Sequence, residues 1–439
     1  MYESVSRAIN IGILKMNFKL VTIIMCAYLL FIGFAQASVP TWDRPFGGTA
    51  NDTAISVQQT SDGGFIIAGS TFSYGPGGSD AWLIKTDKEG KRLWDRPFGG
   101  TANDTAISVE QTSDGGFIMV GSTYSYSAGG SDAWLIKTDA EGNREWDKPF
   151  GGKNNDYGVS VQQTSNRGYI IAGTTFSWGA GGSDVWLIKT DITGTRIWDR
   201  TFGGRNDEFA ASVQETSAGG FIIGATSFSD DTGSDIWLIK TDFNGNKLLD
   251  RSFGGPKNDS VSSVMETSDG GYIIAGTTSS FGAGGSDVWL IKTDNKLNKV
   301  WDKTFGGVND DSAASVVQTL DGGYVIAGTT SSYGEGNSDI WLIKVDNKGN
   351  WTWDKTFGGK NNDSGSSIQE ISRNNYILAG TTNSYTAGGS DAWLIRVLSD
   401  TPSPIGTKSP AEAPKTGGFE MIISVAGLLV AVMENKLKK

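Results

Sequence analysis

Apolar and polar positions alternate with a period of two along most of this chain, in runs of seven or eight residues. In the first complete unit the runs cover 53–60, 65–72, 80–86 and 92–98. Short Gly-containing stretches separate them, such as Ser-Asp-Gly-Gly at 61–64. A period of two predicts half-buried strands, and short Gly-containing connections predict hairpins. We therefore expect an antiparallel meander of four strands, named A to D in chain order, and no helix in the unit.

The unit recurs seven times. A Trp-Asp dipeptide in strand D starts at Trp42, Trp94, Trp146, Trp198, Trp301 and Trp353, and Leu249-Asp250 fills the remaining place. The spacing is 52 residues, with one step of 51. A second marker in strand C places a Trp at 82, 134, 186, 237, 289, 341 and 393. We expect these tryptophans, and the Phe of each Phe-Gly-Gly, to pack between neighbouring units because aromatic side chains bury a large area.

The two ends of the repeat region are complementary. The region opens with a strand D at 41–46 and closes with a strand C at 391–397 that has no strand D after it. If the first piece completes the last unit, the ring has no open sheet edge to aggregate. The sequence therefore predicts an all-β fold, a seven-bladed β-propeller with four-stranded antiparallel blades, closed by the N-terminal strand.

Three motifs add a family resemblance over 42–398. They are Phe-Gly-Gly-x-x-Asn-Asp, Ser-Asp-Gly-Gly-Phe-Ile-Ile-Ala-Gly-Ser-Thr and Trp-Leu-Ile-Lys-Thr-Asp-x-x-Gly. The chain resembles the seven-bladed β-propeller repeat family of bacterial and archaeal surface proteins. The resemblance implies the fold and constrains function little, since propellers host many functions.

The segments outside 38–398 indicate export. Residues 1–37, starting at Met1 or Met16, have a basic start, an apolar run and a small-x-small end at 35–37, as in a signal peptide. An uncleaved membrane anchor is the alternative. Residues 399–418 form a Pro/Ser/Thr linker that we expect to be disordered, and 419–439 combine a short apolar helix, marginal as a membrane span, with a basic tail.

The tail also carries a short motif, Thr-Gly-Gly-Phe-Glu at 416–420. It resembles the Pro-Gly-Phe sorting signal that archaeosortases process, with Gly417 in place of the Pro. A plain tail anchor is the alternative. Either interpretation predicts an extracellular, surface-anchored domain, attached to the membrane through the tail or through a lipid after processing. The resemblance to the sorting signal also favours an archaeal source.

Composition excludes several function classes. The net charge is −11, which argues against nucleic-acid binding because phosphate recognition needs a basic footprint. The chain has no His, so imidazole-dependent catalysis and His-ligated metal sites are ruled out. Its one Cys, Cys26, lies in the leader, so no intramolecular disulfide can form. No cofactor is implied, and we expect a monomer.

Two acids recur in every unit, at one end of the blades. One ends the D–A loop, at Asp52, Asp104, Asp156, Glu208, Asp259, Asp311 and Asp363. The other precedes strand C, at Asp80, Asp132, Asp184, Asp235, Asp287, Asp339 and Asp391. A cation site or a surface for a basic partner is one interpretation. We favour a structural one, in which each carboxylate accepts backbone N–H groups and holds its Gly-rich loop.

A cation recurs in strand C as well. It stands at Lys85, Lys137, Lys189, Lys240, Lys292, Lys344 and Arg396. We expect these residues to be solvated edge charges or partners of the strand-D Asp, each contributing little to stability.

The B–C loops carry a sharper candidate for ligand binding. An aromatic residue stands in six of them, at Tyr74, Tyr126, Trp178, Phe281, Tyr333 and Tyr385. Flat rings flanked by Gly and Asp suit stacking on sugars, and packing on a neighbouring blade is the alternative. The fourth loop departs from the pattern, and its Asp230 and Asp231 could hold Ca²⁺ together with Asp235. An exposed acidic turn is the alternative there.

The units are too alike to reveal one asymmetric active site. No nucleophile motif occurs, and the Gly-rich Phe-Gly-Gly stretch leads into a strand, unlike a dinucleotide fingerprint. We therefore expect a non-catalytic module that binds or scaffolds, with an envelope polysaccharide or a surface protein as its ligand. The alternatives are a polysaccharide lyase or hydrolase that uses carboxylates on the acidic face, and a purely structural spacer. An enzyme should differ in one sector only.

Overall fold

The computed structural model describes residues 42–229, 233–386 and 388–399. Within these ranges every regular element is a β-strand, and the strands form seven antiparallel sheets of four. No helix long and apolar enough to cross a membrane occurs among the residues described. The expected signal peptide and almost all of the linker and tail lie outside them.

Each sheet is one blade, and its strands occupy positions A to D. Position A holds β2 (Asp52–Gln59), β6 (Asp104–Gln111), β10 (Asp156–Gln163), β14 (Glu208–Glu215), β18 (Asp259–Glu266), β22 (Asp311–Gln318) and β26 (Asp363–Ser372). Position B holds β3 (Phe65–Thr71), β7 (Phe117–Thr123), β11 (Tyr169–Thr175), β15 (Phe221–Ser229), β19 (Tyr272–Thr278), β23 (Tyr324–Thr330) and β27 (Asn375–Thr382). Position C holds β4 (Asp80–Thr86), β8 (Asp132–Thr138), β12 (Asp184–Thr190), β16 (Gly233–Thr241), β20 (Asp287–Thr293), β24 (Asp339–Val345) and β28 (Asp391–Leu398). Position D holds β5 (Arg92–Phe98), β9 (Arg144–Phe150), β13 (Arg196–Phe202), β17 (Lys247–Phe253), β21 (Lys299–Phe305), β25 (Trp351–Phe357) and β1 (Trp42–Phe46).

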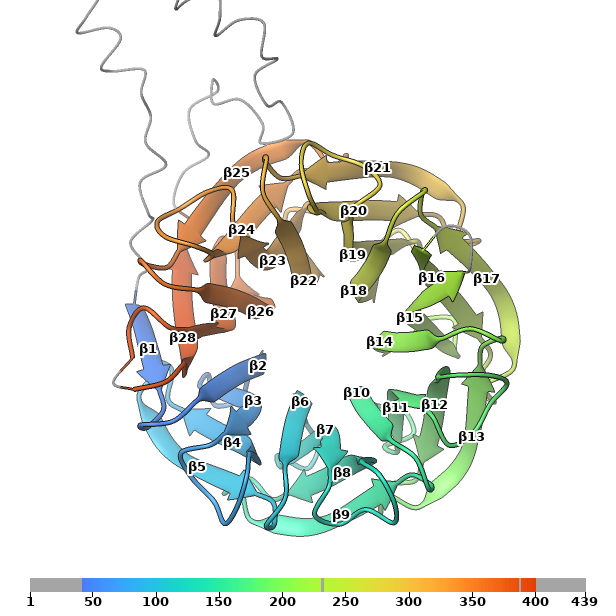
Figure 1. The fold of residues 1–439 in the computed structure, drawn as a ribbon, viewed down its shortest axis with the longest axis vertical. Coiled ribbons are helices and arrows are strands. Elements are labelled where there is room, and N and C mark those ends of the chain that lie inside the picture. Colours follow the sequence, from blue (N-terminus) through green and yellow to red (C-terminus); the bar gives the residue numbers. More distant parts are fainter. Residues whose placement is uncertain (1–41, 230–232, 387, 400–439) are drawn as a thin grey trace, which may run out of the picture.

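The blades stand around a central axis with the A strands innermost and the D strands at the rim (Figure 1). We number them 1 to 7 from β2–β5 to β26–β28. Blade 7 takes β1 as its outer strand, and Trp42 to Phe46 pair in register with Arg396 to Ala392. The predicted seven-bladed propeller, closed by the N-terminal strand, is therefore confirmed.

The core lies between the blades, because the B and C strands are buried on both faces. In blade 1 every residue of β3 and β4 is buried. Trp82 of β4 lies in one apolar cluster with Phe46 of β1 and with Leu394 of β28, so the cluster joins blades 7 and 1. The indole of Trp82 donates its N–H to Asp95 across the β4–β5 pair at 3.1 Å. The strand-D Asp is thus the partner of a buried Trp.

A second aromatic layer joins the blades near the rim. Trp42 packs against Phe65 of the next blade in a tilted arrangement, with ring centroids 6.0 Å apart. Gly90, in the next C–D turn, lies against the same indole at a φ of 76°, and a Cβ there would lie 2.4 Å from Trp42 Cζ3. Four further interfaces repeat this pair, with Gly142, Gly194, Gly245 and Gly349 against Trp94, Trp146, Trp198 and Trp301.

At the interface between blades 4 and 5, two leucines replace the Trp and the Gly. Leu249 replaces the strand-D Trp, and Leu297 replaces the glycine of the facing turn. Leu297 is fully buried in the apolar cluster on which Leu249 packs, at a φ of 61° that branched or bulky residues rarely adopt. The two leucines therefore fill together the space that a Trp and a Gly fill elsewhere.

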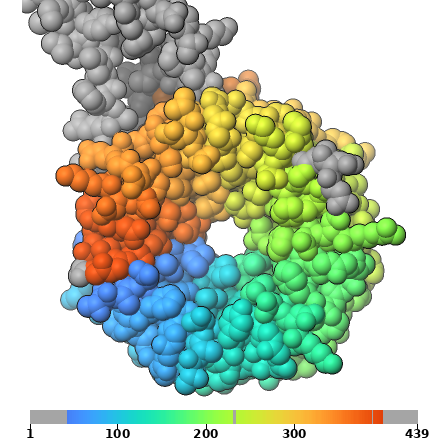
Figure 2. All heavy atoms as spheres, in the orientation of Figure 1, coloured from blue at the N-terminus to red at the C-terminus, as the bar shows by residue number. Residues whose placement is uncertain are grey.

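The inner strands are tied to one another by side chains at the channel wall. In blade 2 the N–H of Gln111 donates to Gln58 Oε1 of blade 1 at 2.5 Å, and the N–H of Val109 donates to Ser56 Oγ at 3.3 Å. The channel is open in the space-filling view (Figure 2), and a cavity of about 270 Å³ lies along its wall. These bonds fix the register of each blade against the next.

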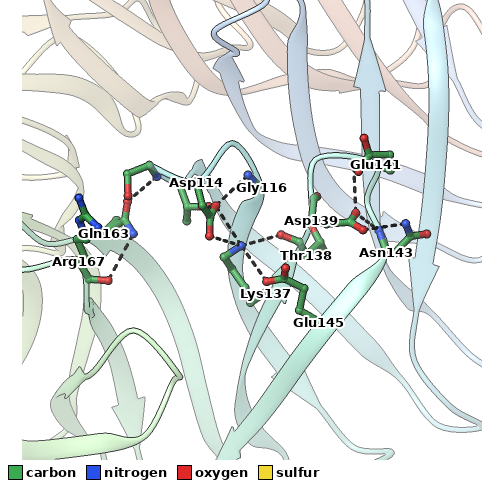
Figure 3. A network of polar contacts seen from close by, with 12 residues as sticks. Asp114, Gly116, Lys137, Thr138, Asp139, Glu141, Asn143, Glu145, Gln163 and Arg167 are labelled. Atoms are coloured by element: carbon green, nitrogen blue, oxygen red, sulfur yellow. Dashed lines mark hydrogen bonds and ion pairs between the residues drawn. The ribbon is translucent and has the colours of Figure 1, made fainter.

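The prediction for the strand-C cations was wrong for the five that are buried, Lys85, Lys137, Lys189, Lys292 and Lys344, whereas Lys240 and Arg396 are half-buried. Lys85 is buried, donates to the carbonyl of Thr86 at 2.9 Å and pairs with Asp62 of the A–B turn at 2.8 Å. Figure 3 shows the same arrangement around Lys137 in blade 2, with Asp114 and Glu145 as its acidic partners. The expected partner, the strand-D Asp, faces the strand-C Trp instead. The long aliphatic stem allows a buried Lys to reach the turn with its charged end.

Candidate ligand-binding face

The acids that end the D–A loops lie at the start of strand A, fully engaged in hydrogen bonds. Asp52 Oδ2 accepts the backbone N–H of Gly48 at 2.8 Å and the hydroxyl of Ser73 at 2.6 Å. Its Oδ1 accepts the hydroxyl of Thr71 at 2.5 Å. These bonds hold the D–A loop against the end of strand B, and the matching bonds recur around Asp104, Asp156 and Asp363.

The acids that begin strand C face these D–A acids across the blade boundary. A Cβ on Gly99 would lie 1.9 Å from Asp80 Oδ1 and 2.8 Å from Asp104 Oδ2, so the two oxygens are at most 4.7 Å apart. The first glycine of Phe-Gly-Gly therefore leaves room for a carboxylate. The equivalent glycine bridges the acid pairs of four other boundaries: Asp391 with Asp52, Asp184 with Glu208, Asp287 with Asp311, and Asp339 with Asp363.

Burial raises the pKa of the strand-C acids in blades 1 to 6. Asp80 is fully buried, and neither of its oxygens has a hydrogen-bond partner in the part of the chain described. In blades 2, 3, 5 and 6 one oxygen accepts a loop N–H, whereas Pro76 stands at that place in blade 1 and has no N–H. Burial, followed by the charge of Asp104, raises the pKa of Asp80 to about 6. Burial raises the pKa of Asp339 to about 6 as well.

The B–C loop aromatics lie on top of the strand-C tryptophans. Tyr74 packs on Trp82 with ring centroids 5.5 Å apart, and its hydroxyl donates to the carbonyl of Gly47 at 2.8 Å. Ring contacts of 4.9–5.3 Å recur for Tyr126, Trp178, Phe281, Tyr333 and Tyr385. One face of each ring is thus occupied within its own blade. Four of the six keep 41–49 % of their surface exposed, and Tyr74 and Tyr333 are half-buried.

The fourth B–C loop is described only in part. Asp230 and Asp231 lie outside the described residues, and Asp235 is the third residue of β16, opposite Ser227. Burial, followed by the charge of Asp259, raises the pKa of Asp235. No group of three or more acidic or Cys side chains that could hold a metal ion occurs among the described residues.

The feature that departs most from the repeat is a row of exposed aromatic side chains at this end of the inner strands. We call it the aromatic arc: Phe72, Tyr124, Tyr157, Phe176, Phe209 and Phe228. Four of its members stand at the end of strand B, where blades 5 to 7 have Ser279, Ser331 and Asn383. The other two, Tyr157 and Phe209, stand second in strand A, where the other blades have Thr or Ser. The arc therefore occupies blades 1 to 4 only.

The arc is continuous through blades 3 and 4. Tyr157 meets Phe176 edge-on at 6.3 Å, Phe176 meets Phe209 of the next blade at 6.3 Å, and Phe209 meets Phe228 at 5.7 Å. Burial, followed by a hydrogen bond with Tyr124 of blade 2, raises the pKa of Tyr157 to about 12. Five members expose 36–54 % of their surface, and Tyr157 is half-buried. The rings support one another and still present apolar area to solvent.

Three D–A loops beside the arc carry a cation. Lys153, Arg205 and Lys257 are exposed, and they stand at the boundaries between blades 2 and 3, 3 and 4, and 4 and 5. The backbone of Lys153 lies against Gly129 of blade 2, and that of Arg205 against Gly181 of blade 3. The residue after Lys153, Asn154, donates to the carbonyl of Phe176 at 2.8 Å. In the next loop Asn206 donates to the carbonyl of Phe228 at 3.1 Å, so these two loops are attached to the strand ends that bear the arc. The loop of Lys257 is attached to Ser280 of blade 5 instead.

No family model matches the chain. A curated relative, the regulatory protein FlaEY of Caulobacter vibrioides, is 25 % identical over 216 residues, which are 46 % of this chain and 18 % of FlaEY. The chain therefore matches less than a fifth of that relative's length.

Solved structures share the architecture at low identity. Puromycin hydrolase superposes with a TM-score of 0.51 at 12 % identity, over 79 % of this chain and 54 % of the hydrolase chain. A protein of unknown function from Dyadobacter fermentans DSM 18053 gives 0.47 at 10 % identity, over 82 % and 99 %. YCF48 bound to a D1 peptide also gives 0.47 at 10 % identity, over 84 % and 99 %. At these identities the likeness shows the propeller fold alone.

Proposed function

We propose that this chain is a non-catalytic binding module outside the cell, which holds a polysaccharide or a surface protein on the aromatic arc. The observation that supports this is the restriction of the arc to blades 1 to 4. Packing demands recur in all seven blades, so an exposed aromatic cluster in one sector serves something outside the repeat. Contiguous apolar patches on a protein surface mark interaction sites, and aromatic rings bury large areas when a ligand covers them.

The acidic positions support a non-catalytic role. A glycosidase needs two carboxylates with different environments in one accessible pocket. Here the D–A acid and the strand-C acid meet beneath their loops, and the arrangement recurs from boundary to boundary. The B–C loop aromatics remain candidates for sugar stacking, but they stand in six blades and their rings are partly covered by tryptophan.

The terminal segments support the proposed location. The leader at 1–37 and the tail at 419–439 predict export and attachment to the cell surface. Both lie outside the described residues, so this part of the proposal rests on sequence. A ring of this kind, tethered by a Pro-rich linker, would present the face with the arc to ligands in the envelope.

A binding comparison tests the proposal. The purified chain and a variant with Phe176→Ser, Phe209→Ser and Phe228→Ser are screened on an array of envelope glycans and on intact envelopes. Blades 5 and 6 carry Ser at the end of strand B, the place of Phe176 and Phe228, and blades 5 to 7 carry Ser second in strand A, the place of Phe209. The repeat itself therefore shows that Ser folds at all three positions. A Tyr126→Ala, Tyr385→Ala variant tests the B–C loops separately.

We expect binding that the arc variant loses and the B–C variant keeps. Equal binding by all three proteins would remove the arc as the site. Binding lost only in the B–C variant would return the site to the loops. The absence of binding to every glycan and envelope preparation would favour the structural spacer.

A further inference from the structure

We propose that the ligand of the aromatic arc is an anionic polysaccharide. Its sugar rings stack on the arc, and its acid groups pair with Lys153, Arg205 and Lys257. This inference rests on the proposed function of the arc as a binding site, and it adds the chemical class of the ligand.

The charge beside the arc is opposite to the charge of the chain. The chain carries a net charge of −11. Yet three successive D–A loops carry a cation. Lys153 and Arg205 follow the second glycine of Phe-Gly-Gly, where the loops into blades 1 and 2 have Thr49 and Thr101. Lys257 stands one residue later in its loop, where those two loops have Ala50 and Ala102. Three of the four cations in the D–A loops therefore stand at the boundaries of blades 3 and 4, beside the continuous part of the arc, and the fourth, Lys360, stands in the loop into blade 7.

These three cations are available to a ligand. All three side chains are exposed, and none of them forms an ion pair among the described residues. The acid nearest to Arg205 in sequence is Asp207, which is held in the loop because its Oδ1 accepts the N–H of Ser183 at 2.8 Å and the hydroxyl at 3.1 Å. Unpaired cations at the edge of an apolar platform attract an anionic ligand and fix its position.

The length of the arc favours a polymer. From Tyr157 to Phe228 the ring centroids are separated by 6.3, 6.3 and 5.7 Å, so this part of the arc is up to 18.3 Å long. A row of rings flanked by cations at three successive blade boundaries presents a repeating pattern, and a chain of acidic sugars repeats in the same way. A single small ligand would use only one of these positions.

Single-stranded nucleic acid also combines stacking with negative charge. It carries a phosphate at every nucleotide, and tight binding without sequence preference needs a positively charged groove along the whole backbone. Three cations on a chain with a net charge of −11 do not form such a groove. The observations therefore favour a polysaccharide, and nucleic acid becomes an outcome of the test.

The test compares two polysaccharide probes that are matched except for their charged groups, and one nucleic-acid probe. Polygalacturonate is the anionic probe, and its methyl-esterified form is the neutral probe with the same sugar ring and linkage. Oligodeoxythymidylate is the nucleic-acid probe. Affinities are measured for the whole chain, for the Phe176→Ser, Phe209→Ser, Phe228→Ser variant and for a Lys153→Gln, Arg205→Gln, Lys257→Gln variant. Lys360→Gln, in the D–A loop that leads into blade 7, is the matched control.

We expect polygalacturonate to bind at least tenfold more tightly than its methyl ester. The arc variant and the triple Gln variant should each lose at least tenfold, and Lys360→Gln should bind like the unchanged chain. Raising salt from about 0.05 to about 0.5 M should weaken the binding, since exposed charges are screened. This pattern supports an acidic polysaccharide as the ligand class.

Other results separate the two proposals. If polygalacturonate and its methyl ester bind equally and only the arc variant loses binding, the arc binds glycans without regard to charge, and the proposal of an anionic ligand is wrong. If oligodeoxythymidylate binds more tightly than polygalacturonate, the ligand class is nucleic acid. If no probe depends on the arc, the proposed function itself fails.

Discussion

The pair Leu249 and Leu297 offers a direct test of how the blades pack. At five boundaries a strand-D Trp lies against a turn glycine, and at one boundary two leucines take their places. We consider Leu249→Trp, Leu297→Gly and the double variant, which converts this boundary to the arrangement of its neighbours. If the two side chains share one space, each single change should be harmful and the two together should compensate.

The structure sets the expected magnitudes. Leu297 is fully buried, so removal of its side chain costs about 2–5 kcal/mol, offset by about 1 kcal/mol from the strained φ of 61°. At the equivalent glycines a Cβ would lie 2.4–2.7 Å from the indole, so Leu249→Trp alone overpacks the boundary by about 1–3 kcal/mol. Additivity would therefore give a loss of about 2–7 kcal/mol in the double variant.

Equilibrium unfolding in urea, followed by far-ultraviolet circular dichroism, measures the four proteins. We expect the double variant to lie within about 1 kcal/mol of the unchanged chain, a coupling of roughly 3 kcal/mol between the two sites. Trp301→Leu with Gly349→Leu, the reverse exchange at another boundary, is the control. A double variant as unstable as the sum of the single changes would refute the shared-space reasoning.

Two predictions concern buried charge. A folded-state pKa of about 6 for Asp80 means that its contribution to stability is fully present below pH ~4 and is lost as the pH rises through 6. Asp80→Asn should therefore stabilise the chain by about 1–2 kcal/mol at pH 8 and change its stability little at pH 4. Asp104→Asn disrupts bonds to two hydroxyls and a backbone N–H, so it should destabilise the chain by about 2 kcal/mol at pH 8. The test is urea unfolding at both pH values, and a loss of stability at pH 8 in Asp80→Asn would contradict the assignment. Lys189, which contacts Asn166, has its pKa lowered to about 8 by burial. Asn166→Asp should therefore stabilise the chain by about 1 kcal/mol at pH 7, and Asp114→Asn, which removes the partner of Lys137, should destabilise it by a similar amount. Urea unfolding checks that the two changes in unfolding free energy have opposite signs.

The fold was accessible from sequence because each local signal occurs seven times. The strands predicted at 65–72, 80–86 and 92–98 agree with β3, β4 and β5 to within one residue. The closure by β1 followed from counting strands: the repeat region starts with a strand D and lacks one at its end, so the first strand completes the last blade. Register within a blade is set by the period of two and the short turns.

The strand-C lysines show where the same reasoning fails. A Lys or Arg at the same place in seven units was interpreted as a solvent-exposed charge at the sheet edge, because Lys is seldom fully buried without a partner. The partner, Asp62 in blade 1, stands in the A–B turn 23 residues before Lys85, and only the pairing of β3 with β4 brings the two together. In blade 4 the turn has Ala218, and Lys240 instead lies over Tyr272 at 5.4 Å and donates to the carbonyl of Asn295 at 3.2 Å.

The aromatic arc was missed for a different reason. Sequence reasoning searched for residues that recur, and it looked for asymmetry only at the acidic positions of the fourth unit. The arc lies in the departures from the repeat, where Phe72, Tyr124, Phe176 and Phe228 stand opposite Ser279 and Ser331. A residue present in all seven blades has a role that all seven share, which is packing. An exposed residue confined to adjacent blades has a role in that sector only. In a closed ring of near-identical units, function is therefore to be sought where the units differ.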